Sequence, residues 1–217
     1  MENLLVMRVE CQGVGVVEVL RARGVVLAGG ASRRMGRNKA FLRHPEGGTF
    51  LERALRLFEQ IGLPAVISGQ LKQFENSHFP QIPDGSEAQG PLGGILSAMA
   101  HYPNDTLLIC AVDVPALSAD ACLRLLRAPL APGQTGRCLV CPNEGEAHRF
   151  FPFPLLLTPQ CRPLLQQTFD AGGRALMPAV AALGLEELEI SAETAEQLIS
   201  TNTPESLKHY YDSVSPK

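Results

Sequence analysis

The stretch LAGGASRRMGRNKA, residues 27–40, combines three glycines with four basic residues and contains no acidic residue. Glycine lets the backbone approach a phosphate closely, and the side chains of Arg34 and Lys39 can neutralise the phosphate charge. The stretch follows the short apolar run GVV, which is typical of a buried strand. We therefore expect a phosphorylated ligand at this loop, with Arg34 and Lys39 stabilising its charge.

The loop matches neither of the two best-known phosphate-binding motifs. A P-loop has a second glycine five positions after the first, but Arg34 and Met35 stand five positions after Gly29 and Gly30. A dinucleotide fingerprint requires G-x-G-x-x-G, which GGASRRMG does not supply. The sequence therefore predicts a phosphate-binding loop of another kind.

The charge distribution indicates a small anionic ligand. Residues 21–43 carry seven basic and no acidic side chains, whereas the whole chain has a net charge of −3. The basic residues are not interleaved with aromatic side chains, which argues against an extended nucleic-acid surface. A phosphorylated metabolite fits this pattern, and we expect no nucleic-acid partner.

The start of the chain and its cysteines favour a cytoplasmic protein. Residues 1–22 are interrupted by charged side chains and lack the unbroken apolar span of an export signal or a membrane segment. The six cysteines lie mostly within apolar runs and not in the dense pattern of a secreted disulfide scaffold. We expect reduced thiols and no membrane association.

A carboxylate is expected at the same end of the sheet as the glycine-rich loop. Asp113 directly follows the apolar run TLLICAV, so its side chain should project from the carboxyl edge of the sheet. Because Mg²⁺ prefers oxygen ligands and keeps several waters, one or two carboxylates suffice to hold it. One interpretation of Asp113 is therefore a catalytic residue and metal ligand, and the other is a simple turn, since Asp followed closely by Pro is common in turns.

The second candidate for metal chemistry is CLVC, residues 138–141. A structural zinc site needs four ligands, and no second cysteine pair stands at a suitable spacing. We therefore interpret these cysteines as strand residues and not as a zinc or redox site.

Apolar runs alternate with helical patterns along the chain. Four runs rich in Val, Leu and Ile are expected as buried strands: 24–28, 65–68, 106–112 and 138–140. Helix start signals stand between and after them, including a capping box of Thr49 with Glu52 and the prolines that follow Thr158 and Thr203. This order predicts a single α/β domain whose mainly parallel, mixed sheet is covered by helices on both faces. The expected parts are an N-terminal extension, the domain and a flexible tail: 1–22, 23–212 and 213–217.

The longer motif LAGGASRRMGRNKAFL resembles the signature loop of the molybdenum cofactor guanylyltransferase family. The resemblance covers residues 24–210 and continues in order through four motifs: PDGSEAQGPLGGILSAM, CAVDVPAL, AGGRAL and STNTPESL. It implies a Rossmann-like nucleotidyltransferase fold of the nucleotide-diphospho-sugar transferase type. It also implies Mg²⁺-dependent transfer of GMP from GTP to the terminal phosphate of the molybdopterin cofactor, and it suggests a molybdoenzyme or its chaperone as a protein partner.

The resemblance further implies which residues bind the nucleotide. They match the family's strand ends and glycine-rich turns: Leu27, Ala28, Gly29, Gly30, Lys39, Ser68, Asp84, Gly90, Gly93 and Asp113. Ser68 stands where the family usually has asparagine, and serine has a shorter reach. Asp84 could accept from the N1–H and N2–H₂ donors of guanine, and Leu-Ala-Gly-Gly is typical of guanine-using members. We therefore expect a preference for GTP over CTP and ATP.

Three residues are implied on the side of the pterin substrate. Asn202 keeps the third position of STNTPESL, where the family usually has asparagine at the first and third positions and this chain has Ser200 at the first. His148 and Arg149 could face the substrate's phosphate, with a solvent-exposed strand end as the alternative.

Two other functions are compatible with these residues. The first is a related nucleotidyltransferase that uses another nucleotide or another phosphate acceptor. The second is a nucleotide-binding regulatory protein without turnover, which the serines at positions 68 and 200 suggest.

Overall fold

The computed structural model describes residues 21–29, 38–83, 90–142 and 148–214. Its centre is a seven-stranded sheet in the order β3-β2-β1-β4-β6-β5-β7. The strands are β1 (Ala22–Leu27), β2 (Ala65–Ser68), β3 (Gln81–Ile82), β4 (Thr106–Ala111), β5 (Gly136–Cys141), β6 (Arg149–Leu157) and β7 (Glu186–Glu189). Among these described strands, β6 alone runs antiparallel to both of its neighbours. The predicted α/β class with a mainly parallel, mixed sheet is confirmed.

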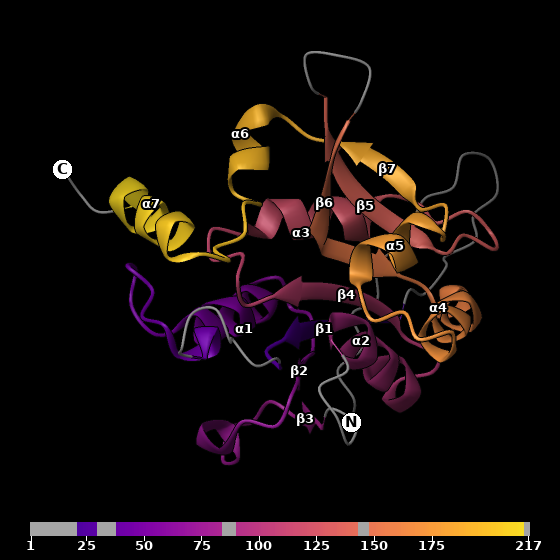
Figure 1. The fold of residues 1–217 in the computed structure, drawn as a ribbon, viewed down its shortest axis with the longest axis horizontal. Coiled ribbons are helices and arrows are strands. Elements are labelled where there is room, and N and C mark those ends of the chain that lie inside the picture. Colours follow the sequence, from indigo (N-terminus) through magenta and orange to yellow (C-terminus); the bar gives the residue numbers. More distant parts are fainter. Residues whose placement is uncertain (1–20, 30–37, 84–89, 143–147, 215–217) are drawn as a thin grey trace.

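Helices cover both faces of the sheet (Figure 1). The α-helices are α1 (Phe50–Gln60), α2 (Gly90–His101), α3 (Ala119–Arg127), α4 (Arg162–Asp170), α5 (Leu176–Ala181), α6 (Ala192–Glu196) and α7 (Pro204–Val214). Three short 3-10 helices complete the described elements: η1 (Lys39–Phe41), η2 (Lys72–Phe74) and η3 (Pro159–Cys161). The helices α1 and α3 pack on one face, and α2, α4 and α5 pack on the other.

Local signals in the sequence set where the elements begin. The predicted capping box is present: Thr49 Oγ1 accepts from the amide of Glu52 at 3.2 Å, and Glu52 Oε2 accepts from the amide of Thr49 at 2.7 Å. Helix α7 begins at Pro204, and Thr203 Oγ1 accepts from the amide of Ser206 at 3.1 Å. The four predicted strands correspond to β1, β2, β4 and the centre of β5.

The first and last elements of the described part of the chain are β1 and α7. Ala22 is the first residue of β1, where it is buried and aligned with Thr106 of β4. At the other end α7 continues through Val214, and Ser213 Oγ donates to the carbonyl of Tyr210 at 2.7 Å. Residues 213 and 214, expected within the tail, are therefore helical.

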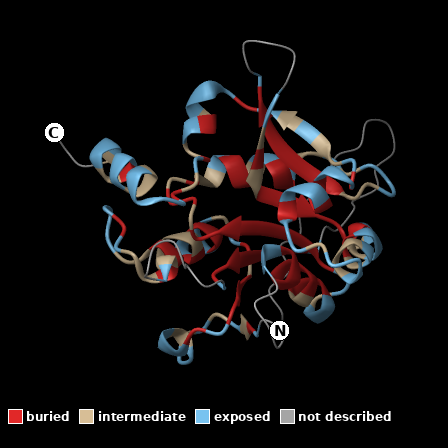
Figure 2. Cartoon of the chain, in the orientation of Figure 1, coloured by how far each residue is buried: buried red, intermediate tan, exposed pale blue. Residues whose placement is uncertain are grey.

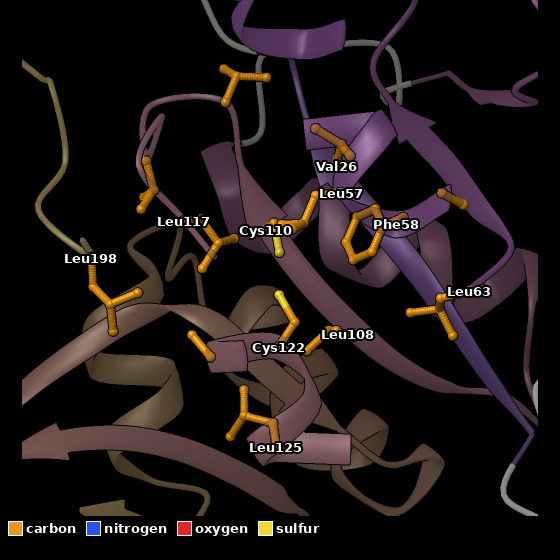
Figure 3. Packing of buried hydrophobic residues seen from close by; sticks show 14 of the residues in the cluster. Val26, Leu57, Phe58, Leu63, Leu108, Cys110, Leu117, Cys122, Leu125 and Leu198 are labelled. Carbon is orange, nitrogen blue, oxygen red and sulfur yellow. The ribbon is translucent and has the colours of Figure 1, made fainter. Parts of the chain in front are cut away.

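The apolar core lies on both faces of the sheet, with buried residues in the strands and on the inner sides of the helices (Figure 2). In the cluster that joins β4 to α1 and α3, the sulfur atoms of Cys110 and Cys122 point toward one another (Figure 3). Burial raises the pKa of the Cys110 thiol. The cysteines of the described ranges are free and buried. Within these ranges, no helix combines the length and the apolar character needed to cross a lipid bilayer.

The CLVC motif forms part of β5, as predicted. Cys138 and Cys141 are 2% and 8% exposed. Burial and the nearby charge of Glu187 raise the pKa of Cys138 to about 12, so this thiol is protonated at neutral pH. A neutral thiol packed within a sheet is a structural residue.

Helix α7 lies beside the segment that precedes α1 (Figure 1). Tyr210 is the buried residue of this helix, and its hydroxyl oxygen lies 2.6 Å from Nε2 of His44. The same nitrogen lies 3.3 Å from the carbonyl oxygen of Pro115, and Nδ1 of His44 accepts from the amide of Glu46 at 3.1 Å. A buried imidazole therefore links α7 to two loops that follow η1 and β4.

His44 makes the stability of the fold depend on pH. Burial lowers the pKa of His44 below its ordinary value of 6.5. The charged and titratable groups around its ring are Glu46, Arg53, Arg56 and Tyr210. Because the unfolded chain then binds a proton more readily than the folded chain, the free energy of unfolding decreases as the pH falls below 6.5.

We expect the unfolding temperature to fall more steeply between about pH 7.5 and about pH 5.5 in the wild type than in His44→Gln. Thermal unfolding measured across this range tests the difference in slope. His78→Gln serves as the control, because His78 is 74% exposed at its side chain. Parallel curves for the wild type and His44→Gln would contradict the expectation.

Candidate active site

Three neighbouring strands end together at the edge where the predicted loops lie. In the parallel pairings of β1, Leu27 is aligned with Ser68 of β2 and with Ala111 of β4. Leu27 leads into the glycine-rich stretch, and Asp113 follows the end of β4 by two residues. The carboxyl edge therefore brings these loops together, which is where ligands bind in sheets of this class.

Lys39, Asp113 and Asn202 meet at this edge. Nζ of Lys39 donates to Oδ1 of Asn202 at 2.6 Å and lies 3.6 Å from Oδ2 of Asp113. The side chains of Lys39 and Asp113 are 12% and 20% exposed, so water screens their attraction only in part. The structure thus brings together the predicted phosphate-binding cation, the predicted metal ligand and one residue predicted on the pterin side.

The short helix η1 fixes the start of the Lys39 side chain. Asn38 caps this helix, because its Oδ1 accepts from the amide of Ala40 at 3.0 Å. The carbonyl of Lys39 accepts from the amide of Leu42 at 3.0 Å, and Ala40 is fully buried. The backbone of Lys39 is therefore held on both sides while its ammonium reaches the sheet edge.

Thr201 holds the backbone of Asp113, a role that the sequence did not indicate. Its amide donates to the carbonyl oxygen of Asp113 at 2.7 Å, and its hydroxyl donates to the same oxygen at 3.3 Å. Beside it, Nδ2 of Asn202 donates to Oγ of Ser200 at 2.7 Å. Ser200, which departs from the family pattern, therefore orients the Asn202 amide so that its oxygen faces Lys39.

Ser68 and Gly69 shape the turn at the start of the glycine-rich stretch. The carbonyl oxygen of Ser68 accepts from the amides of Ala28 and Gly29, each at 3.0 Å. Gly69 has a φ of +124°, and a Cβ at this position would lie 2.8 Å from the amide nitrogen of Gly29. Ser68 is 1% exposed, so its observed role is through its backbone. A contact between its hydroxyl and the nucleotide stays a prediction.

The first turn of α2 forms a second glycine-rich edge. Gly90 has a φ of +68°, and a Cβ there would lie 2.9 Å from the carbonyl oxygen of Arg174. Gly93 is buried one turn further along. A contact between this small-residue turn and the nucleotide stays a prediction. Three predicted site residues lie outside the described part of the chain: Gly30, Arg34 and Asp84.

His148 and Arg149 lie at the beginning of β6, where this strand pairs with β5 and not with β4. His148 Nδ1 is 3.5 Å from Glu187 Oε2, and its Nε2 is 3.8 Å from Glu189 Oε1. Cζ of Arg149 lies 4.9 Å from the centre of the Phe151 ring. Two carboxylates around His148 attract a cation more than a phosphate. The alternative of a solvent-exposed strand end fits both residues, and their contact with the pterin substrate stays a prediction.

The residues at the edge fit a magnesium ion that is shared with phosphates. Asp113 supplies one partly exposed carboxylate, and the described residues contain no cluster of three or more His, Cys, Asp or Glu side chains arranged for a metal. Mg²⁺ is commonly bound through one or two carboxylates together with substrate phosphates and waters. Asp113 is thus suited to a substrate-bound ion rather than to a closed protein cage.

The model of one known protein family matches most of the chain. The model of the MobA-like NTP transferase domain matches residues 24–184. The chain belongs to the MobA-like NTP transferase family. Lys39 and Asp113 of this MobA-like chain lie within the matched range, and Asn202 follows it. The predicted membership of a nucleotidyltransferase family is thereby confirmed.

Curated relatives and solved structures agree with this family. A "Probable molybdenum cofactor guanylyltransferase" of Rhodopirellula baltica is 30% identical to the MobA-like chain over 200 residues, which is 88% of this chain and 92% of the relative. The "Molybdenum cofactor guanylyltransferase" of Xanthomonas euvesicatoria is 33% identical over 186 residues, which is 84% and 90% of the two chains. The structure of molybdopterin-guanine dinucleotide biosynthesis protein A from Archaeoglobus fulgidus superposes with a TM-score of 0.66 at 19% identity, covering 88% of this chain and 97% of that one. The relatives support guanylyl transfer at the level of the family, and the solved structure supports the fold.

Proposed function

We propose that this MobA-like chain transfers GMP from GTP to the terminal phosphate of the molybdopterin cofactor and releases pyrophosphate. An oxygen of the acceptor phosphate forms a new bond to the α-phosphorus of GTP. The bond between that phosphorus and the oxygen that bridges to the β-phosphate breaks, and pyrophosphate leaves with this oxygen. The observation that carries the proposal is the contact of Lys39 with Asp113 and Asn202 at the carboxyl edge. The names of the relatives support the choice of substrates.

Lys39 acts on the phosphates through a positioned charge. Its ammonium has three donors, and the oxygens of Asn202 and Asp113 face it at 2.6 Å and 3.6 Å, so a further donor remains for a phosphate oxygen. Phosphoryl-type transfer depends mainly on positioning and on neutralising charge, with little need for a protein nucleophile. A lysine fixed by an amide and a carboxylate meets this requirement.

Asp113 would hold Mg²⁺ at the carboxyl edge. When bound, the ion neutralises phosphate oxygens and lowers the repulsion between the two anionic substrates. Thr201 fixes the Asp113 backbone through the bonds described above, so the carboxylate extends from a backbone that is held in place.

Base choice tests the proposal directly. We expect the turnover efficiency with GTP to exceed that with CTP and with ATP by about 100-fold, because a site built around the donors of guanine leaves buried groups unpaired with another base. Pyrophosphate release is measured with each triphosphate in the presence of Mg²⁺ and molybdopterin. In Gly29→Ala we expect a smaller preference for GTP over CTP, since the added methyl narrows the slot for a purine.

The possible results separate the alternative functions. Equal or better use of CTP would overturn the guanylyl assignment and leave the nucleotidyltransferase family intact. Activity with GTP and a sugar or polyol phosphate, but not with molybdopterin, would assign a different acceptor. Tight GTP binding without pyrophosphate release in the presence of molybdopterin would indicate a regulatory protein.

A further inference from the structure

The stretch from residue 200 to the end of α7 touches both sides of the candidate active site. At its beginning, Thr201 binds the backbone of Asp113 and Asn202 binds Nζ of Lys39. At its other end, the hydroxyl of Tyr210 meets His44, and the hydroxyl of Tyr211 donates to the carbonyl of Arg43 at 2.8 Å. We refer to residues 200–214 as the C-terminal clamp.

The position of the clamp depends on Tyr210. Among the residues of α7, Tyr210 is the buried one, while most of the helix faces solvent (Figure 2). Its ring meets the ring of Phe50 edge-on at 6.1 Å and that of His44 at 5.8 Å. Pro204 and Tyr210 are separated by about 9 Å of rigid helix at 1.5 Å per residue. Fixing Tyr210 therefore fixes the start of α7 and, with it, Asn202 two residues earlier.

His44 connects this anchor to the two loops that carry the reactive groups. Its Nδ1 accepts from the amide of Glu46, which puts the ring proton on Nε2. That nitrogen lies between Tyr210 Oη and the carbonyl oxygen of Pro115, two residues after Asp113. His44 itself follows Lys39 by five residues. One buried ring thus joins the segments that carry Lys39, Asp113 and Asn202.

We propose that His44 and Tyr210 are positioning residues for guanylyl transfer, and that they act by holding the C-terminal clamp so that Asn202 orients Lys39 beside Asp113. This inference rests on the proposed function, because the reaction whose groups are positioned is the proposed transfer of GMP. This role does not require either residue to touch the substrates. They act through the hydrogen bond of 2.6 Å that Lys39 Nζ donates to Asn202 Oδ1.

Tyr210→Phe is the central variant, because it removes one hydroxyl and keeps the aromatic ring. We expect kcat for GMP transfer to fall about fivefold, with the KM for GTP changed by less than about twofold. In an Asn202→Ala background the same substitution should change kcat by less than about twofold, because the path through Asn202 is already broken. Additive effects of the two substitutions would overturn the proposal.

Hydrogen exchange tests the clamp without relying on the reaction. The amide of Thr201 is bonded to Asp113 at 2.7 Å, and the residue is 2% exposed, so its exchange should be slow in the wild type. We expect about tenfold faster exchange in Tyr210→Phe. Tyr102→Phe is the matched control, since Tyr102 stacks under Arg23, which lies at the amino end of β1, away from the carboxyl edge. Unchanged exchange at Thr201 would overturn the proposal even in an active enzyme.

Variants of His44 give a second test if Tyr210→Phe unfolds. The longer side chain of His44→Gln can place a donor near the position of Nε2, toward Tyr210 and Pro115. The shorter side chain of His44→Asn reaches only the position of Nδ1, where it can still accept from Glu46. We expect faster exchange at Thr201 and lower kcat in His44→Asn than in His44→Gln, and equal values in both would contradict the inference. If the wild type releases no pyrophosphate from GTP, the proposed function fails, and the exchange measurements alone decide whether His44 and Tyr210 position the clamp.

Discussion

Replacing Asp113 with asparagine is expected to lower guanylyl transfer about 100-fold or more at a Mg²⁺ concentration that saturates the wild type. Asparagine keeps the size of the side chain but removes the anionic oxygen that attracts the ion. The backbone of residue 113 should stay in place, because Thr201 binds its carbonyl and not its side chain. The expected effect is therefore on catalysis and on the Mg²⁺ requirement.

The measurement is the rate of pyrophosphate release as a function of Mg²⁺ concentration. We expect partial recovery of Asp113→Asn at high Mg²⁺, and an unfolding free energy within about 1 kcal/mol of the wild type, because the pair with Lys39 is partly exposed. Asp170→Asn is the matched control, with the same loss of charge at an exposed position at the end of α4. The same Mg²⁺ dependence in Asp113→Asn and the wild type would mean that the ion is held elsewhere.

The sequence predicted the parts of the fold that depend on local patterns. The strands β1, β2 and β4 contain the apolar runs GVVL, AVI and LLICA, and the capping box at Thr49 is a contact between residues three positions apart. By contrast, β7 has the sequence EELE at the edge of the sheet, where β5 is its one neighbour among the described strands. An exposed edge strand of charged residues carries no hydrophobic period, so nothing local predicts it.

The candidate site was predictable in its residue types and not in its contacts. The motifs placed Lys39 in the loop that follows one strand and Asp113 at the end of another, and the sheet topology brings the two residues together. Asn202 was expected on the pterin side, but it binds Lys39 across 163 positions of sequence. Such a contact depends on where α7 packs. The contact of Tyr210 with His44, which holds α7 in place, has no signature in the sequence. Tertiary packing therefore supplied the links among residues that the motifs had identified one by one.

The second large effect on catalysis is expected when Lys39, the lysine at the centre of these contacts, is replaced. Lys39→Met keeps the apolar length of the side chain and removes the charge that faces the phosphates. Loss of one charge-assisted contact in a partly dry site should cost about 2–4 kcal/mol in the transition state. This corresponds to a fall in kcat of roughly 30- to 1000-fold. The fold should survive, since the backbone bonds of η1 do not involve the ammonium.

Single-turnover rates with saturating GTP and molybdopterin measure this effect apart from binding and product release. Lys72→Met on η2 is the matched control, because it removes the same charge from an exposed side chain outside the site. Lys39→Arg adds a further comparison: its planar fork cannot reproduce a point charge held between Asn202 Oδ1 and Asp113 Oδ2, so we expect only partial activity. Because the ammonium is proposed to act on the reacting phosphates, an unchanged rate for Lys39→Met at saturating substrate would remove Lys39 from the chemical step and leave it as a partner of Asp113 in the folded structure.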